Sequence, residues 1–489
     1  MFKYFFLFQL AALLLAHSFI NYKYSESLLA VFVTVSFINS FCFFYSIRTN
    51  LNNNIHITVF CIGYLIVFFQ NYLEILLGII AVDDIPRSIA SHAAIIRCAS
   101  LSTIGLVGFF AGVSCIPPAA SEPLNAPLKD QVKHSPLVLE KFLIMFSAFA
   151  VFLISNYPYL INVQYSQELL ESRSWLSNIS LLIFQYFVIL YLAFVCFDVM
   201  CRKQKITLVG FLKCCGWPLN IFTSLFVAAL FIGGDRGGAL AVVLPYIVAF
   251  LLVSKRKVSY KTVLLGCVIG CLFLGIIARF RSINSAVPLS ERIIESVEIN
   301  PNAGHKYTPT YEMARSVVVF HNIVEFIPQE HPYLYGYFHF WEIANIIPGV
   351  ARIHKMLCEH FRYWSSSYFC TWLYFGDNYP MGMGTAWNAD LYMNYGLWGV
   401  LIGSFVWGWW LARIRNQVQY KSPSVGWIIC YLVISSVVLI SGRGSFFCFI
   451  RTLIHMYILY FVYNCIATAC CRVHYLDQSR KTVQDCEEN

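Results

Sequence analysis

The chain has 489 residues, of which 58% are hydrophobic and only 12% are charged. Soluble domains carry about 25% charged residues, so this composition excludes an ordinary soluble protein and indicates a polytopic membrane protein. The formal net charge is +9, but the lysines and arginines occur in short runs between apolar segments. Such runs are typical of topology signals, and we therefore expect no nucleic-acid partner.

Apolar segments of membrane-spanning length recur from the first residues of the chain onward. A helix needs about 20 apolar residues to cross a bilayer, with a range of roughly 17 to 25. About twelve segments approach this length, and the first is interpreted as a retained span because it lacks a small-residue cleavage site. The predicted spans are residues 2–20, 28–45, 57–81, 99–116, 137–155, 175–199, 217–232, 240–253, 262–278, 397–412, 425–440 and 446–466.

The cations between these segments predict the orientation of the protein. Lysines and arginines gather at residues 202–205, 255–261 and 413–421, and these loops alternate with cation-poor ones such as residues 156–174. Cation-rich loops face the cytoplasm, so twelve spans place both termini there. The insert between the ninth and tenth spans, residues 279–395, is then predicted to lie outside.

The insert is the longest stretch that water would accept, and it is the predicted working part of the protein. Thr308 and Pro309 predict the start of a helix that ends before Pro328. A second helix is expected over residues 338–347, ahead of Pro348. No repeat or linker divides the chain, so we expect one integral membrane domain over residues 1–489.

Arginines at helix ends on the predicted outer face form the main functional signal. Arg236 and Arg443 each lie between glycines in a short hairpin, and Arg279 opens the insert. Arginine offers forked donors that match phosphate oxygens, and glycine lets backbone amides approach an anion. The pattern favours a pyrophosphate site, which Arg451 would join if residues 443–451 were one helix. The alternative is that each arginine only extends its charge to lipid headgroups.

The same face carries groups that could act as an acid or a base. His321 and Glu325 are spaced to share a helix face, and Asp390 ends the insert. Further candidates are His331, Glu342 and Asp377. No metal or nucleotide motif occurs, so we expect no metal and no cofactor. Whether Cys358 and Cys370 form a disulfide stays open.

Several short motifs, taken in order, resemble bacterial Wzy-type repeat-unit polymerases, which include O-antigen and enterobacterial common antigen polymerases. The resemblance covers roughly residues 200–465. The matching pieces are Gly233-Gly234-Asp235-Arg236-Gly237, Tyr335-Gly336-Tyr337 with Ile347-Pro348-Gly349, Leu391-Tyr392-Met393-Asn394-Tyr395-Gly396-Leu397-Trp398-Gly399-Val400, and Ser441-Gly442-Arg443-Gly444-Ser445-Phe446 ahead of Arg451.

This resemblance implies an all-α, GT-C-like glycosyltransferase of the bacterial inner membrane whose reaction occurs at the periplasmic face. The growing glycan on undecaprenyl pyrophosphate would be transferred to the next lipid-linked repeat unit. Arg236, Arg443 and Arg451 would bind the pyrophosphate, with Arg279 and Arg315 next, and the base would be His321, Glu325 or Asp390. Membrane lipids, a chain-length regulator and a flippase are implied partners.

Two alternative functions remain open at this point. An O-antigen ligase would transfer the glycan to lipid A core, although the outer-loop histidine pattern of that family is not convincing here. A transporter or flippase of a lipid-linked sugar would show inverted repeats and charges near the membrane midplane, whereas these charges gather toward one face.

Overall fold

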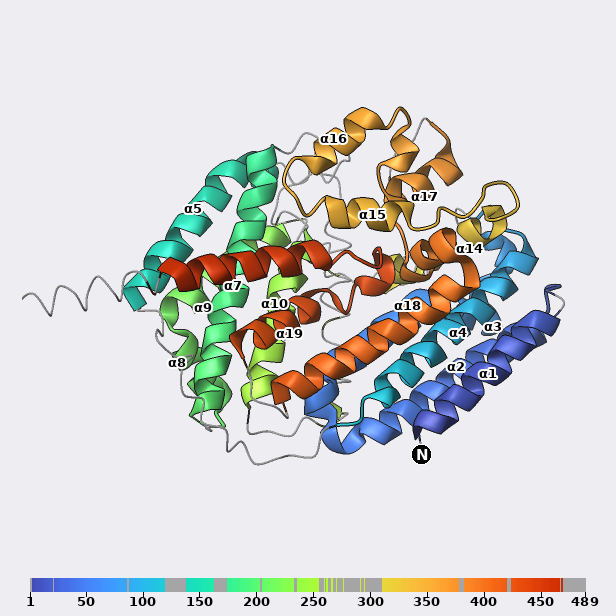
Figure 1. Ribbon diagram of the computed structural model, residues 1–489, viewed down its shortest axis with the longest axis horizontal. Helices are drawn as coiled ribbons and strands as arrows, with labels where there is room; N and C mark the ends of the chain where they lie inside the picture. Colours follow the sequence, from blue (N-terminus) through green and yellow to red (C-terminus); the bar gives the residue numbers. More distant parts are fainter. Residues whose placement is uncertain are drawn as a thin grey trace, which may run out of the picture.

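The computed structural model describes residues 2–20, 22–85, 88–118, 138–161, 174–202, 205–232, 235–254, 310–377, 382–419, 424–466 and 468, with a few isolated positions between 259 and 294. The regular elements of the described chain are helices (Figure 1). The longer ones are α1 (Phe2–Phe19), α2 (Glu26–Ile47), α3 (Ile55–Leu76), α4 (His92–Cys115), α5 (Val138–Ile161), α7 (Trp175–Cys201), α9 (Trp217–Ile232), α10 (Arg236–Val253), α18 (Trp387–Gln419) and α19 (Val425–Val437).

Within the described residues, seven helices are long and apolar enough to cross a membrane. An eighth is obtained if the short helix α8 (Leu208–Cys215) and α9, which meet at a bend of 97°, count as one span. Shorter apolar helices include Val425–Val437 and Ile450–Ile466. The all-α polytopic architecture is therefore confirmed, while the number twelve and the GT-C-like arrangement stay predictions. Most of the predicted ninth span, residues 262–278, lies outside the described residues.

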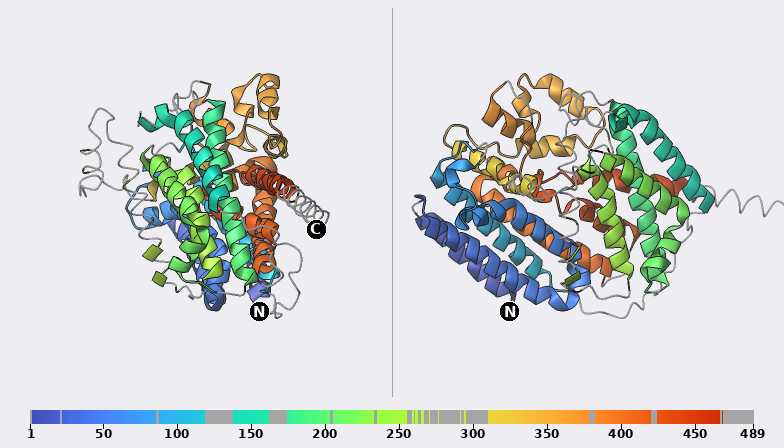
Figure 2. Two further views of the ribbon diagram at one scale, coloured as in Figure 1. Left: turned by 90° about the vertical axis from the view of Figure 1, so that its left-hand side faces the viewer. Right: turned by 180° about the vertical axis from the view of Figure 1, so that it is seen from behind.

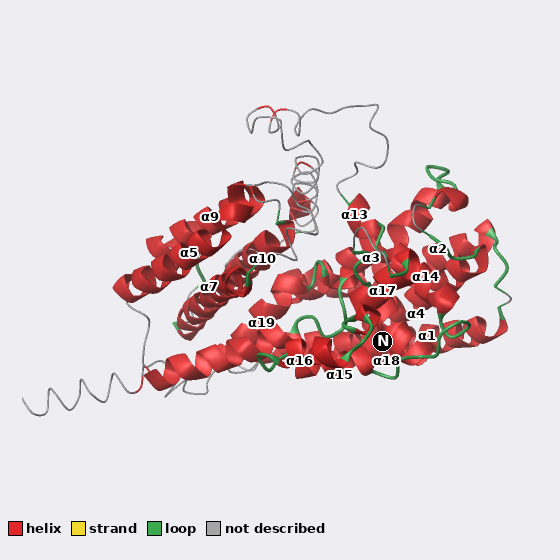
Figure 3. Ribbon diagram, turned by 90° about the horizontal axis from the view of Figure 1, so that it is seen from above, coloured by secondary structure: helices red, strands yellow, loops and turns green. Residues whose placement is uncertain are grey.

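The helices form two groups that are separate when seen from above (Figure 3). In one group, α1, α2 and α18 pack against α4, and α2 also contacts α3. In the other group, α5, α9 and α10 pack around α7, and α19 covers α7 and α10. The contact between α18 and α19 links the two groups.

The central contact of the first group is the crossing of α4 and α18. A Cβ atom on Gly112 would overlap the backbone carbonyl of Phe405, and one on Gly408 would overlap that of Phe109. Hydrogen atoms in place of side chains thus let the two backbones touch. Small residues are common at such contacts between membrane helices. The hydrophobic effect does not drive helices together inside a bilayer, so close van der Waals packing must do so.

Three short helices, α15 (Tyr337–Ala344), α16 (Val350–Leu357) and α17 (Ser366–Phe375), form a lobe at one end of the molecule. Figure 2 shows this lobe, in gold, at the same end in both views. We call this end of the molecule the lobe end. The second predicted insert helix, residues 338–347, corresponds to α15.

The first predicted insert helix is present as α13 (Tyr311–Ala314) and α14 (Val317–Phe326). The apolar residues Val317, Phe320 and Val324 are buried, and so are the polar residues His321 and Asn322. The helix packs against α4, α17 and α18. Part of the predicted aqueous insert is therefore core, because α14 fills the space beside the lobe end of α4.

Candidate functional site

The start of α15 is fixed against the first half of α18. Leu334 and Tyr335 donate backbone hydrogen bonds of 2.9 and 3.0 Å to the carbonyls of Met393 and Asn394. Gly336, at φ 84°, then turns the chain into α15, and its amide donates to the Asn394 side chain over 3.1 Å. This clamp places His339, one turn into α15, beside Asp390.

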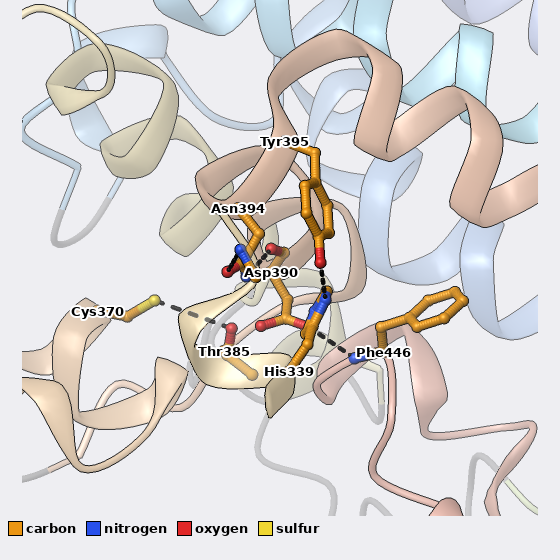
Figure 4. A network of polar contacts seen from close by, with 8 residues as sticks. His339, Cys370, Thr385, Asp390, Asn394, Tyr395 and Phe446 are labelled. Atoms are coloured by element: carbon orange, nitrogen blue, oxygen red, sulfur yellow. Dashed lines mark hydrogen bonds and ion pairs between the residues drawn. The ribbon is translucent and has the colours of Figure 1, made fainter. Parts of the chain in front are cut away.

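His339 and Asp390 form a buried pair at the lobe end (Figure 4). The Nε2 atom of His339 lies 2.8 Å from Oδ2 of Asp390, and the Phe446 amide donates to the same oxygen over 2.8 Å. Burial acts to lower the pKa of His339, but the hydrogen bond and charge of Asp390 outweigh it and raise the pKa. The carboxylate therefore fixes the orientation of the imidazole and favours its protonation.

The other ring nitrogen of His339 faces a hydroxyl. Its Nδ1 atom lies 3.2 Å from the hydroxyl of Tyr395, whose side chain is 44% exposed. With the Nε2 proton held by Asp390, Nδ1 is the basic atom of the neutral ring and accepts from Tyr395. The three groups form a chain from a buried carboxylate to a solvent-accessible hydroxyl, along which a proton can move.

Glu342 lies one turn after His339 on α15 and shares its electrostatic environment. Burial and the negative charge of Asp390 raise the pKa of Glu342 to about 8, although Ser445 and the charge of His339 partly oppose the shift. Glu342 therefore stays largely protonated near neutral pH. A strongly shifted pKa of this kind is typical of residues in active sites.

The loop that carries Arg443 contacts this cluster directly. Ser441, Gly442 and Arg443 form one turn of 3-10 helix, Gly444 is extended, and the amide of Phe446 reaches Asp390. Arg443 is exposed at the surface of the loop. The condition for Arg451 to share a helix face with Arg443, one helix over residues 443–451, is not met, because the chain opens at Gly444, where the Phe446 amide reaches the carboxylate.

Arg451 lies on the helix Ile450–Ile466. The Nε2 atom of His455, one turn later, lies 3.1 Å from the Ile346 carbonyl, and its Nδ1 atom lies 3.3 Å from the Tyr186 hydroxyl. The side chain of Arg451 is exposed. The helix that carries Arg451 therefore runs toward α7, while Arg443 lies in the 3-10 turn before it, so the two arginines do not share a helix face.

The first turn of α10 begins at Arg236 and contacts α7 next to Tyr186, the residue that contacts His455. Gln185 donates to the Gly238 carbonyl over 3.2 Å, next to Tyr186 in sequence. The carboxylate of Asp235 accepts the Gly238 amide over 2.9 Å. The glycines around Arg236 predicted that an anion would bind the backbone amides at this helix end. In the structure the Asp235 carboxylate already binds one of these amides, that of Gly238. The side chain of Arg236 and all of Arg279 lie outside the described residues.

His321, Glu325 and Arg315 lie on α14 or just before it, and they contact Tyr72, Ser91 and Tyr311 respectively. Glu325 accepts hydrogen bonds from the amide and hydroxyl of Ser91 over 3.1 and 2.6 Å, and so holds the start of α4. Burial lowers the pKa of His321 to about 3, and its Nε2 lies 2.9 Å from the Tyr72 hydroxyl. Arg315 lies 5.2 Å from the centre of the Tyr311 ring. Of the three predicted base candidates, only Asp390 has an imidazole partner.

The remaining sequence candidates occupy peripheral places. Asp377 is exposed after α17, and His331 contacts the Pro332 carbonyl at 2.7 Å. Cys358 and Cys370 are free thiols with separate neighbours, the hydroxyls of Tyr337 and Thr385. Among the described residues, no group of three His, Cys, Asp or Glu side chains is arranged to hold a metal ion.

Sequence reasoning missed His339 and Tyr395. Both lay in segments that were identified, the predicted second insert helix and the motif that precedes the tenth span. A signal was available, because His339 and Glu342 are three residues apart in an aromatic helix and therefore share a face. The spacing between His339 and Asp390 in sequence gives no indication that they touch.

Comparisons of the chain with protein-family models, with curated proteins and with solved structures find no match.

Proposed function

We propose that this protein is a membrane-embedded glycosyltransferase that polymerises oligosaccharide repeat units linked to a polyprenyl pyrophosphate. The observation that carries the proposal is the hydrogen bond from Phe446 to Asp390, at 2.8 Å. This contact joins the exposed Arg443 loop to the His339 pair, so a cation for a phosphate and a proton-accepting unit belong to one site. The site lies at an end of apolar helices, where a lipid-linked substrate would present its headgroup.

The reaction follows from the order of these groups. A hydroxyl of the acceptor sugar attacks the anomeric carbon of the lipid-linked glycan, and the bond from this carbon to the phosphate oxygen breaks. The electron pair leaves with the pyrophosphate, whose growing charge Arg443 stabilises. The proton of the acceptor hydroxyl passes to Nδ1 of His339, directly or through Tyr395, while Asp390 stabilises the imidazolium.

The environment of the site suits this chemistry. Asp390 is fully buried and His339 is 4% exposed, so their interaction is little screened by water. Tyr395 is the exposed member of the chain, and the exposed tyrosine Tyr335 lies close to its segment. Aromatic rings at such a surface can stack against sugar faces. Arg236, Arg279, Arg315 and Arg451 remain further candidates for the pyrophosphate.

The test is a glycan gel of cells that lack the gene and carry either the wild-type protein or Arg443→Gln, with equal amounts of protein in the membrane. The expected result is a ladder with wild type and a single-repeat band with the variant. A full ladder with Arg443→Gln would remove this arginine from the site. Loss of even the single-repeat band on deletion would point to a ligase or flippase and would overturn polymerisation.

A further inference from the structure

A second cation at the lobe end, Arg97, has no role in the site described above. It lies in the second turn of α4 and is half-buried, between the fully buried residues Ile96 and Cys98. Ser91 caps this helix and is held by Glu325. Arg97 is six residues further on, about 9 Å along the helix axis. A guanidinium at this depth in a span is costly unless an anion or water compensates it.

The protein supplies little negative charge to Arg97. Within the described part of the chain, its guanidinium has no carboxylate in ion-pair contact and no hydrogen-bond acceptor. The centre of the Tyr392 ring lies 6.0 Å from the Arg97 guanidinium carbon. A half-buried arginine that faces neutral groups leaves its five N–H donors for another partner.

The surroundings of Arg97 are rich in hydroxyl groups. The Ser100 hydroxyl lies 2.9 Å from Nδ1 of His17, and the Tyr22 hydroxyl contacts the same nitrogen. Burial raises the pKa of Tyr22, whereas the Ser100 hydrogen bond and the positive charge of Arg97 lower it. Tyr22, Ser100 and His17 therefore form one polar cluster between α1 and α4, one turn from Arg97, and none of the three carries a carboxylate.

Arg97 and the His339 site lie on opposite faces of one helical segment. Asp390 and Tyr392 are two residues apart in α18, so their side chains point about 200° apart around the helix axis. Asp390 turns toward His339, and Tyr392 turns toward Arg97. The two sites are thus adjacent at the lobe end but do not share a ligand-facing surface.

We propose that Arg97, with the hydroxyl of Tyr392, which is buried and finds no hydrogen-bond partner among the described residues, binds a phosphate group at the lobe end of α4 and α18. A phosphate has the negative charge that this position lacks and the oxygens that an arginine fork and a hydroxyl donor match. The inference goes beyond the proposed function, which places pyrophosphate on the Asp390 side. The phosphate can belong to a polyprenyl phosphate, to a bilayer lipid or to a free anion, and binding measurements separate these sources.

The experiment is native mass spectrometry of the delipidated full-length protein in detergent. Polyprenyl phosphate, phosphatidylglycerol and inorganic phosphate are titrated separately against wild type, Arg97→Gln and Arg48→Gln. Arg48 is a matched control, because it is an exposed arginine that lies 3.5 Å over the ring of Tyr45. We expect Arg97→Gln to bind at least one phosphate probe about tenfold more weakly than wild type, and Arg48→Gln to bind as wild type does.

The pattern across probes identifies the source. An effect with polyprenyl phosphate alone assigns the site to that lipid class, an effect with both lipids assigns it to bilayer headgroups, and an effect with inorganic phosphate alone assigns it to a soluble anion. Equal binding of all three probes by wild type and Arg97→Gln overturns the proposal. If Arg97→Gln does not fold, Arg97→Lys replaces it, since lysine keeps the charge and loses the fork. Arg97→Lys is expected to bind at least one phosphate probe threefold to tenfold more weakly than wild type, and binding of all probes equal to wild type overturns the proposal.

Discussion

The two halves of α18 meet at Gly396, whose φ of 65° breaks the helix, and they are buried in different ways. Residues 397–412 pack largely by shape, with Gly408 against the backbone of Phe109. Residues 387–395 pack by hydrogen bonds, since Asn388 donates to Tyr64 over 2.7 Å and Asp390 accepts from His339 and Phe446. A polar helix can thus be as buried as an apolar one, provided that its polar groups find partners.

The difference predicts that the first half of α18 governs activity and the second half governs stability. Asp390→Asn is expected to reduce polymer formation about 10³-fold, because an amide no longer favours the imidazolium or fixes the tautomer of His339. The measurement is the rate of transfer by purified protein supplied with lipid-linked repeat units, with the melting temperature as a check on folding.

Glu325→Gln is the matched control for Asp390→Asn, because it makes the same change at a carboxylate that holds Ser91, the residue that caps α4. It should keep activity within about twofold and lower stability by about 1 kcal/mol, the typical contribution of one hydrogen bond. If Glu325→Gln abolished transfer and Asp390→Asn did not, the reaction would belong to the α14 side and the assignment of the site would be wrong.

A substitution at the contact between α4 and the second half of α18 should affect stability before activity. Gly112→Ala places a methyl group against the Phe405 carbonyl where α4 crosses α18, so the helices must separate. Overpacking of this kind costs about 1–3 kcal/mol. Thermal unfolding in detergent measures the loss, and Gly382→Ala, which has open space around its Cβ position, should leave the melting temperature unchanged. Equal melting temperatures for all three proteins would contradict the close crossing.

A further expected effect is the pH dependence of stability that Glu342 contributes. Its pKa is raised to about 8 in the folded protein, whereas an exposed glutamate titrates near 4.3. Between these values the unfolded state releases a proton that the folded state keeps, so the contribution is fully present below about pH 4 and is lost as pH rises through 8. The slope is at most about 1.4 kcal/mol per pH unit.

Glu342→Gln removes this titration and tests the assignment. The melting temperature of wild type should fall more steeply between pH 5 and 8 than that of Glu342→Gln, and the two curves should run parallel above about pH 8. Parallel curves over the whole range would mean that Glu342 is ionised in the folded protein. The strongly shifted pKa that is typical of active-site residues would then be absent from this position.

The amino-acid sequence determined the parts of this protein that depend on local chemistry. Runs of about 20 apolar residues must become helices in a bilayer, because each backbone amide needs an internal partner there. The predicted spans 2–20, 28–45 and 175–199 accordingly match α1, α2 and α7 within a few residues. The helix expected ahead of Pro348 is likewise present, as α15.

Only the tertiary structure decided which polar groups meet. Asp390 was placed in an aqueous insert because it interrupts an apolar pattern, yet it is buried because His339 and the Phe446 amide compensate its charge. His339 is 51 positions away from it in sequence and Phe446 is 56 positions away. No periodicity encodes such distances, since they depend on how Gly336, Gly396 and Gly444 turn three separate segments toward one point.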